Sequence, residues 1–271
     1  MSKLDLPLIV EPDALAPILE QEGLLVVDLT KPSTYAQLHV PGAVFLDYRN
    51  IVANRKPTLG LVPPMAELEQ TLSGIGIDDS IHVVAYDDEG GGKAARLLWT
   101  LEAMGHQHFS LLNGGLHAWA NEGYPVQQTP VEPVFRHFNA APDSTPVADR
   151  EYILQHLESP DVALLDARTP DEFSGVKRYA ERGGHIPGAI NMDWMLALDQ
   201  SRNLRLKERD VLKSILDQLG VRPEQQVVTY CHTHHRSSLS YIMLKWLGYP
   251  RVKGYPGSWS DWGNRNDTPV A

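Results

Sequence analysis

Short apolar runs alternate along the chain with stretches in which apolar residues recur at the spacing of one helix face. The runs are rich in valine and leucine and cover residues 25–28, 83–86, 163–166 and 227–230. Helical spacing occurs in residues 67–72 and 211–216, and again in the segment that Gly248 ends. Strands that alternate with helices in this way predict a mostly parallel sheet with helices on both faces. The expected fold class is therefore α/β.

The whole pattern occurs twice. Residues 25–30 are echoed by 163–168, 39–43 by 185–189, 83–87 by 227–231, 114–119 by 257–262, and 124–126 by 268–270. The pairs keep one order along the chain, at separations between 138 and 146 positions. A repeat of this length is too long for a solenoid, so it indicates two tandem domains.

The 271 residues suffice for two domains that each bury a core of their own. We expect the first domain at residues 1–127 and the second at residues 147–271. Residues 128–146 are rich in proline and small polar side chains, so they are expected to form an extended linker.

Composition narrows the choice of partners and compartment. The net charge of -10 argues against nucleic acid or an anionic membrane surface as a partner. Residues 1–8 lack the apolar segment of a signal peptide, and no apolar run has the length needed to span a membrane. A single cysteine permits no intrachain disulfide, which fits a reducing compartment. We therefore expect a cytoplasmic protein, and a monomer, because a two-domain chain can enclose a site by itself.

The single cysteine, Cys231, directly follows one predicted strand and precedes a predicted helix. Open parallel sheets bind ligands at the carboxyl ends of their strands, and the free N–H groups of a helix start favour an anion. Such surroundings lower the pKa of a thiol and populate its nucleophilic thiolate. Three histidines and Arg236 stand within five positions of Cys231. A reactive thiol is therefore the stronger hypothesis, and a buried, inert cysteine is the weaker one.

The repeat pairs Cys231 with Asp87 in the first half. The first loop is acidic and rich in glycine and has no nucleophile, whereas the second is basic and has a thiol. An anion would be repelled by the first loop and attracted by the second, so we expect the first domain to be inactive. Asp87, Asp88 and Glu89 lack the ligand spacing of a known metal loop, and a solvated or interdomain-facing acidic turn is the favoured interpretation.

Neither a cofactor nor a metal is expected. Residues 90–93 lack the Gly-Lys-Ser/Thr end of a P-loop, and no Gly-x-Gly-x-x-Gly follows a strand. Cys231, His234 and His235 could be interpreted as zinc ligands. Adjacent residues rarely reach one tetrahedral ion, however, and the sequence offers no second cluster to supply a fourth ligand.

The repeated blocks resemble the rhodanese family over essentially the whole chain. The His-x-Pro-Gly-Ala motif at residues 39–43 and 185–189 is similar to the amino-terminal signature of that family. Residues 254–259, followed by Trp262, resemble its carboxyl-terminal signature. The resemblance implies two tandem rhodanese-like domains, of which the second carries the active loop. Asp28, Asp166, His39 and His185 occur in both halves, so we interpret them as structural.

The activity that this resemblance implies is transfer of sulfur from thiosulfate to cyanide or another thiophile. Cys231 is the expected catalytic residue: its thiolate takes the outer sulfur of thiosulfate as a persulfide and releases sulfite. The small anions thiosulfate, cyanide and sulfite are the expected partners, with a protein sulfur acceptor as a further one. Some animal relatives bind the donor with an arginine at the position of Glu172, which is acidic here.

The loop around Cys231 supplies the expected substrate-binding residues. Backbone N–H groups from His232 to Ser237 are expected to surround the sulfur, and Arg236 to bind a sulfonate or to stiffen the loop. The histidines are assigned bulk, hydrogen bonds and a pH-dependent charge. The complete set is His232, Thr233, His234, His235, Arg236 and Ser237.

Three alternatives remain open. The loop differs from the Cys-Arg-Lys-Gly loop of animal thiosulfate enzymes and from the Cys-Gly-[Ser/Thr]-Gly loop of mercaptopyruvate enzymes, so 3-mercaptopyruvate is an alternative donor. A persulfide relay to a protein acceptor is the second alternative. The third is a cysteine-based phosphatase, which uses Cys-x5-Arg. The Cys-x4-Arg spacing from Cys231 to Arg236 has room for one sulfur atom but should crowd a phosphate.

Overall fold

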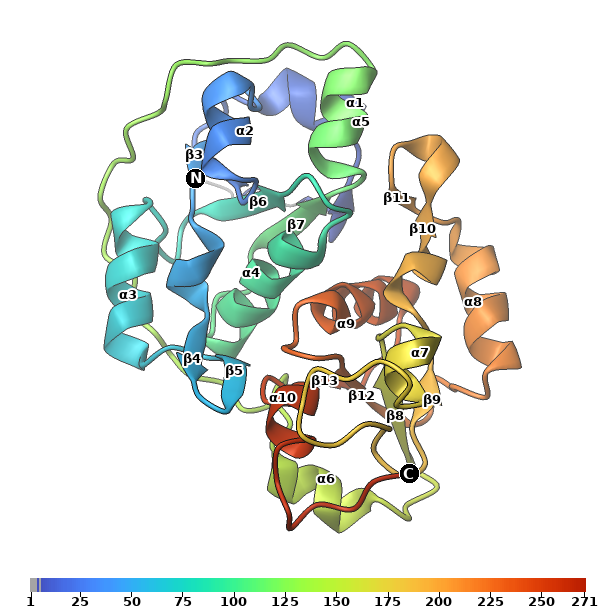
Figure 1. The fold of residues 1–271 in the computed structure, drawn as a ribbon. Coiled ribbons are helices and arrows are strands. Elements are labelled where there is room, and N and C mark those ends of the chain that lie inside the picture. Colours follow the sequence, from blue (N-terminus) through green and yellow to red (C-terminus); the bar gives the residue numbers. More distant parts are fainter. Residues whose placement is uncertain (1–3, 5) are drawn as a thin grey trace. The chain divides into compact units, whose positions relative to one another are not determined.

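The computed structural model describes residue 4 and residues 6–271 (Figure 1). The expectation that residues 1–8 are not a signal peptide falls partly on Met1, Ser2, Lys3 and Asp5, which lie outside the described residues. Among the described residues, no helix is both long and apolar enough to cross a bilayer. The chain divides into two compact units, and neither unit is continuous in sequence.

Unit 1 comprises residues 1–51, 63–143 and 199–206. Its parallel five-stranded sheet has the order β1-β7-β6-β2-β3. The strands are β1 (Ile9–Val10), β2 (Leu24–Asp28), β3 (Val44–Phe45), β6 (His82–Tyr86) and β7 (Phe109–Leu112). The helices are α1 (Pro12–Leu15), η1 (Ala16–Ile18), α2 (Pro32–Gln37), η2 (Tyr48–Ile51), α3 (Met65–Gly74), α4 (Gly92–Ala103), α5 (Gly115–Asn121) and η4 (Gln200–Arg202).

Unit 2 comprises residues 52–62, 144–198 and 207–271. Its parallel four-stranded sheet has the order β13-β12-β8-β9. The strands are β8 (Val162–Asp166), β9 (Ile190–Asn191), β12 (Gln226–Tyr230) and β13 (Val252–Gly254). The helices are α6 (Arg150–His156), α7 (Pro170–Phe173), η3 (Trp194–Ala197), α8 (Arg209–Gln218), α9 (Arg236–Leu247) and α10 (Ser258–Trp262).

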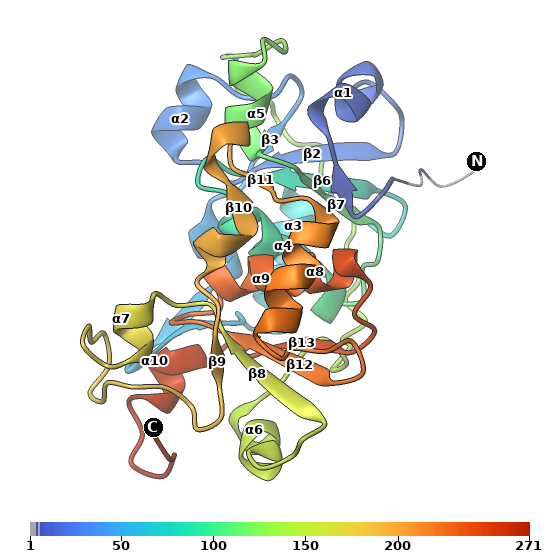
Figure 2. The same cartoon turned by 90° about the vertical axis from the view of Figure 1, so that its right-hand side faces the viewer.

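Helices cover both faces of each sheet, as the α/β prediction requires. Figures 1 and 2 place α9 on one face of the unit 2 sheet and α6 on the other. In unit 1 they place α4 and α5 on opposite faces. The middle strands β6 and β12 are almost completely buried, which explains why their sequences are mostly apolar. The predicted fold class is confirmed, and the segments with helical spacing form α3, α8 and α9.

Two short segments pack with the half of the chain to which the repeat does not assign them. Residues 52–62, which form the antiparallel hairpin of β4 (Ala53–Arg55) and β5 (Thr58–Leu61), belong to unit 2. Residues 199–206 belong to unit 1, where Arg205 forms ion pairs with Glu11 and Glu122. They include most of the second hairpin, β10 (Leu198–Asp199) and β11 (Arg205–Leu206). Continuous boundaries at 127 and 147 remain a prediction, and these segments depart from them.

Candidate active site

Cys231 lies at the carboxyl end of β12, in the middle of the unit 2 sheet (Figure 1). The next four residues form a tight loop, and α9 begins at Arg236. Helix α9 packs back against β12 and β13. The loop therefore joins the end of a buried strand to the amino terminus of a buried helix, which is where a parallel sheet offers free N–H groups.

The Cys231 thiol is 1% exposed and lies among polar groups. Burial raises the pKa of this thiol, but the charge of Arg236 lowers it, and so do hydrogen bonds from the Ser237 hydroxyl, the Ser237 amide and the Thr233 amide. The net effect is a pKa below the ordinary value. These groups favour the thiolate, which is the nucleophilic form.

Arg236 is held in place by Glu172. Its two terminal nitrogens donate to the two carboxylate oxygens of Glu172 at 2.7 and 2.8 Å. Thr169 caps helix α7 and also hydrogen-bonds to Glu172. Burial raises the pKa of Glu172, but the hydrogen bond and charge of Arg236, together with Thr169, bring it down to about 2. The sequence marked Glu172 only as a difference from relatives, because 64 positions separate it from Arg236.

His232 and Thr233 form the outer part of the loop. The His232 ring lies against the ring of Tyr179, and its carbonyl accepts from the amide of Ser260. Burial and then the charge of Arg236 lower the pKa of His232, which disfavours the charged form of this ring. The pH-dependent charge expected of the loop histidines stays a prediction.

The hairpin of residues 52–62 packs against this part of the loop in unit 2. The Leu59 amide donates to the Ser260 hydroxyl at 3.0 Å, and that hydroxyl donates to the Leu59 carbonyl at 2.9 Å. Gly60 has φ +73°, and a Cβ atom there would lie 2.3 Å from the carbonyl oxygen of Thr233. Only glycine fits this approach. No signal in the repeat connects Gly60 with the active loop.

His234 has a left-handed backbone, with φ 52°. Its amide donates to the Ser258 hydroxyl at 3.0 Å, and its Nδ1 lies 2.8 Å from the Ser237 hydroxyl. The Cys231 amide also donates to Ser258, at 3.3 Å. The expected ring of amides is thus only partly correct: those of Thr233 and Ser237 reach the sulfur, whereas that of His234 is bound to Ser258. The His235 ring lies near Trp194.

The corresponding loop of unit 1 encloses a carboxylate. Asp87 is 1% exposed, and its two oxygens accept from the amides of Glu89, Gly91, Lys93 and Ala94 at 2.8–3.0 Å. The expectation of a solvated turn is therefore wrong for Asp87. The reason is that these four amides replace the water that a carboxylate would otherwise require.

Asp28 and Asp166 support the ends of their strands, as expected. Asp28 accepts from the Thr30 amide and from the Tyr86 hydroxyl. Asp166 forms a buried pair with Arg168 at 2.6 Å. His39 and His185 bond to carbonyl groups through Nδ1 and stack on Tyr35 and Phe173, respectively. These contacts agree with a structural role.

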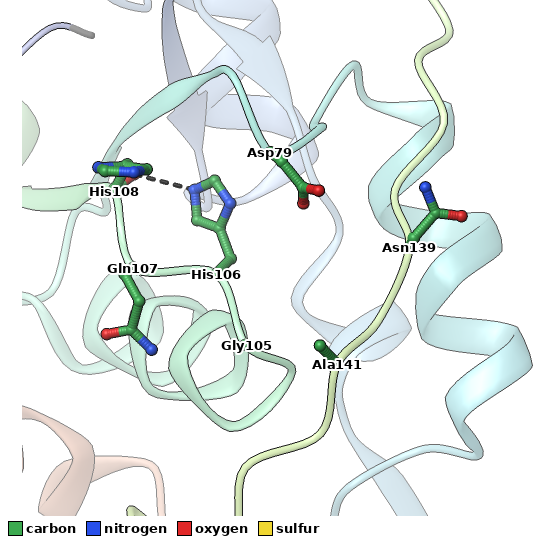
Figure 3. Close-up of a pocket in the computed structure, with 7 residues that line it drawn as sticks. All are labelled: Asp79, Gly105, His106, Gln107, His108, Asn139 and Ala141. Carbon is green, nitrogen blue, oxygen red and sulfur yellow. Dashed lines mark hydrogen bonds between the residues drawn. The ribbon is translucent and has the colours of Figure 1, made fainter.

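A cavity of about 350 Å³ lies in unit 1 and is lined by Asp79, Gly105, His106, Gln107, His108, Asn139 and Ala141 (Figure 3). The His106 ring bonds to the His108 carbonyl at 2.9 Å. None of the predicted site residues lines this cavity. Within residue 4 and residues 6–271, no group of three or more His, Cys, Asp or Glu side chains is arranged to hold a metal ion.

Known proteins resemble this chain over nearly its whole length. It is 44% identical over 266 residues to the thiosulfate sulfurtransferase of Pseudomonas aeruginosa, covering 98% of this chain and 97% of the relative. The thiosulfate sulfurtransferase of Azotobacter vinelandii is also 44% identical, over 265 residues and the same shares of each chain. The sulfur carrier protein TtuD of Thermus thermophilus is 32% identical over 246 residues, covering 86% of this chain and 85% of TtuD.

A solved structure shares the fold. The anaerobic ergothioneine biosynthesis enzyme from Chlorobium limicola superimposes with a TM-score of 0.88 at 22% identity, over 97% of this chain and 69% of that enzyme. The model of the rhodanese-like domain matches residues 11–122 and again residues 149–265. Two copies of that domain, together with the two relatives at 44% identity, show that the chain belongs to the rhodanese family.

Proposed function

We propose that this protein is a thiosulfate sulfurtransferase that carries sulfur as a persulfide on Cys231. The observation that carries the proposal is the buried thiol at the end of β12, whose pKa Arg236 and the hydrogen bonds of Thr233 and Ser237 lower. The relatives at 44% identity bear the name of this activity. Family, fold and site chemistry therefore support the same reaction.

The reaction divides into two displacements at sulfur. The Cys231 thiolate attacks the outer sulfur of thiosulfate, the S–S bond of thiosulfate breaks, and sulfite leaves with the bonding electron pair. Cyanide then attacks the outer sulfur of the persulfide, thiocyanate leaves, and the thiolate returns. Neither step needs an oxidant or a proton, and the covalent intermediate predicts ping-pong kinetics.

The way in which the unit 1 loop binds Asp87 is an argument for a persulfide on Cys231 in the unit 2 loop. In both loops the amides two and six positions after the first residue reach its side chain: Glu89 and Lys93 for Asp87, Thr233 and Ser237 for Cys231. An aspartate oxygen is two bonds from Cβ, and so is the outer sulfur of a cysteine persulfide. The Asp87 carboxylate thus models, within this chain, how such a loop binds a terminal anion through N–H groups.

Arg236 and the remaining loop residues take complementary parts in the proposal. Because both terminal nitrogens of Arg236 are bound to Glu172, we assign Arg236 to a fixed positive charge and to loop rigidity, in preference to a sulfonate grip. Thr233 and Ser237 bind the sulfur. His232 lies at the outer side of the loop with Tyr179, and His235 lies near Trp194. We assign these two to the approach of the donor.

The direct test is steady-state kinetics with thiosulfate and cyanide varied together. We expect parallel double-reciprocal lines for the wild type and no thiocyanate from Cys231→Ala. Thiocyanate formation by that variant would contradict the proposal. 3-Mercaptopyruvate as donor and an aryl phosphate as substrate are the matched comparisons: faster turnover of either one would move the assignment to that alternative.

A second candidate function is transfer of the persulfide to a protein acceptor. The observation that favours it is the 32% identity to a protein named as a sulfur carrier. Fast persulfide formation followed by slow turnover with cyanide would support this alternative. A cytoplasmic location and a monomeric state also remain proposals. The single cysteine and the two-unit chain support them, and sedimentation of the purified protein tests the second.

A further inference from the structure

The Ser237 hydroxyl lies between the Cys231 thiol and the His234 imidazole. It hydrogen-bonds to the cysteine sulfur on one side and lies 2.8 Å from His234 Nδ1 on the other. Cys231 is 1% exposed, and His234 and Ser237 are both 0% exposed. The three side chains therefore form a buried series in which the hydroxyl is the middle member.

His234 is fixed in this position at both its backbone and its side chain. Its amide donates to Ser258 at 3.0 Å, and its carbonyl accepts from the Ser238 hydroxyl at 2.6 Å. Its φ of 52° lies in the left-handed region, which is unfavourable for a residue other than glycine. Such backbone strain persists where the surroundings over-determine it, and it occurs often at functional sites. Here it aims the imidazole at Ser237.

The proton count of the series restricts its hydrogen-bond directions. A serine hydroxyl has one proton, so it donates to one neighbour only. When it donates to a thiolate at Cys231, it accepts from His234, and Nδ1 must then carry a proton. When the thiol carries the proton, the hydroxyl can donate to an unprotonated Nδ1. The two arrangements differ by the shift of one proton along the series.

We propose that His234 receives the proton of the Cys231 thiol through the Ser237 hydroxyl. The S–H bond breaks as an O–H bond forms at Ser237, and the original O–H bond of Ser237 breaks as an N–H bond forms at His234 Nδ1. The products are a thiolate and an imidazolium. No charge enters or leaves the buried site, so ionisation avoids the cost of an isolated buried thiolate.

Other charged and titratable groups lie around the series. Arg236 is paired with Glu172, and Arg168 is paired with Asp166. Tyr230 precedes the thiol, and burial raises its pKa well above the ordinary value. His232 and His235 complete the loop, with rings near Tyr179 and Trp194. The hydrogen bond between His234 Nδ1 and Ser237 reaches a group that is itself bound to the sulfur.

The test is the rate of alkylation of Cys231 by iodoacetamide as a function of pH, without any sulfur donor. His234→Asn is the decisive variant, because asparagine tolerates a left-handed backbone and can hydrogen-bond to Ser237, but it takes up no proton. We expect its thiolate to form about one pH unit or more above that of the wild type, which makes alkylation near neutrality about tenfold slower. At a pH where every thiol is ionised, the two rates should agree.

Three further variants complete the comparison. Ser237→Ala removes the middle hydroxyl and should raise the pH midpoint of alkylation as His234→Asn does. Ser237→Thr keeps a hydroxyl and should have the midpoint of the wild type. His156→Asn makes the same substitution on α6, where the ring bonds to the Tyr152 carbonyl, and should leave the midpoint unchanged. A wild-type midpoint for His234→Asn would overturn the proposal and leave His234 with a structural role.

A second measurement needs no change at His234. Nitrogen NMR of the His234 ring reports its protonation in the wild type and in Cys231→Ser. Since the two sites are coupled, the ring should hold both protons to a higher pH when the thiolate is present. Identical protonation in the two proteins would overturn the proposal. That this thiolate serves in sulfur transfer rests on the proposed function. Neither readout depends on sulfur transfer, so the proton-transfer proposal and the proposed function can fail separately.

Discussion

The loop after β6 in unit 1 and the loop after β12 in unit 2 share their geometry and differ in chemistry. Each begins with a buried residue, Asp87 or Cys231, five positions before the start of a helix. Gly90 and His234 are the left-handed positions that match in the two loops, with φ 101° and 52°. One loop binds its own carboxylate through four amides, and the other has a thiol that can acquire an anionic sulfur.

The difference bears on our proposal that unit 2 is active and unit 1 is inactive. The anion-binding amides come with the strand, loop and helix, so both units possess them. In the proposed mechanism, reactivity depends on three further features that the unit 2 loop has and the unit 1 loop lacks: a thiol, the cation of Arg236, and the hydroxyl of Ser237. Their counterparts in unit 1 are Asp87, Gly92 and Lys93.

The largest effect is expected for Cys231→Asp, which gives unit 2 the first residue of the unit 1 loop. Thiocyanate formation should fall by at least about 10⁴-fold, because the nucleophile is gone. The aspartate should accept hydrogen bonds from the loop amides, whereas Cys231→Ala leaves these amides without an anion. The melting temperature of Cys231→Asp should therefore be higher than that of Cys231→Ala. Calorimetry and the thiocyanate assay measure both results. A melting temperature below that of the alanine variant would show that the two loops are not equivalent.

The next effect concerns the pair that unit 1 lacks. Glu172→Gln leaves the guanidinium of Arg236 without its anionic partner, which should lower the free energy of unfolding by about 3 kcal/mol. The pKa of Glu172 in the folded protein is about 2, below its unfolded value. Its contribution is therefore present above about pH 5 and is lost as the pH falls toward 2. The wild type should lose more stability over that range than the variant.

A matched control for this pair is Glu151→Gln. Glu151 pairs with Arg150 on the surface, where its side chain is 57% exposed. No measurable change in stability is expected, because solvent screens exposed pairs. Equal losses of stability for the two variants would contradict a special role for the pair of Glu172 and Arg236.

A smaller effect is expected from Asp87→Cys in the Cys231→Ala background. The new thiol has the amides of the loop, but glycine stands where unit 2 has Arg236, and Lys93 is paired with Glu89 at 3.0 Å. Alkylation near neutrality should be about tenfold slower than at Cys231, because the thiolate is less stabilised. Alkylation at the rate of Cys231 would show that the amides alone activate the thiol.

The smallest effect concerns the hairpin that supports the active loop. In Gly60→Ala the added Cβ would lie 2.3 Å from the Thr233 carbonyl oxygen, so the loop must shift. Gly220→Ala is the control, because Gly220 has φ +77° and nothing within 4 Å. We expect Gly60→Ala to be less stable than Gly220→Ala by about 1–2 kcal/mol and to raise the KM for thiosulfate. Equal stability and equal KM for the two variants would show that the hairpin does not support the active loop.

The sequence predicted the features that depend on local pattern. Apolar runs and helical spacing predict β12 and α9, and they place Cys231 directly after the carboxyl end of β12. The repeat paired Cys231 with Asp87 because five blocks keep one order. Family resemblance then supplied the chemistry, and the comparisons confirm the family. These predictions concern either neighbouring residues or a register that the chain repeats.

The features that the sequence did not predict join distant positions or depend on backbone conformation. Glu172 and Arg236 are 64 positions apart, and Gly60 contacts a loop in the other half of the sequence. A linear repeat assigns residues 52–62 to the first domain, whereas two hydrogen bonds between the Leu59 backbone and the Ser260 hydroxyl hold them in unit 2. His234 was one of three similar histidines until its positive φ and its bond to Ser237 distinguished it.

The central claim is that the Cys231 thiolate accepts and releases a single sulfur atom. Intact mass spectrometry of the wild type, of Cys231→Ala and of Cys231→Asp tests it directly, first with excess thiosulfate and then after addition of cyanide. We predict that the wild type gains the mass of one sulfur and then loses it, and that neither variant changes. A gain of sulfur by either variant would contradict the account. So would a wild type whose mass changes neither with thiosulfate nor with cyanide.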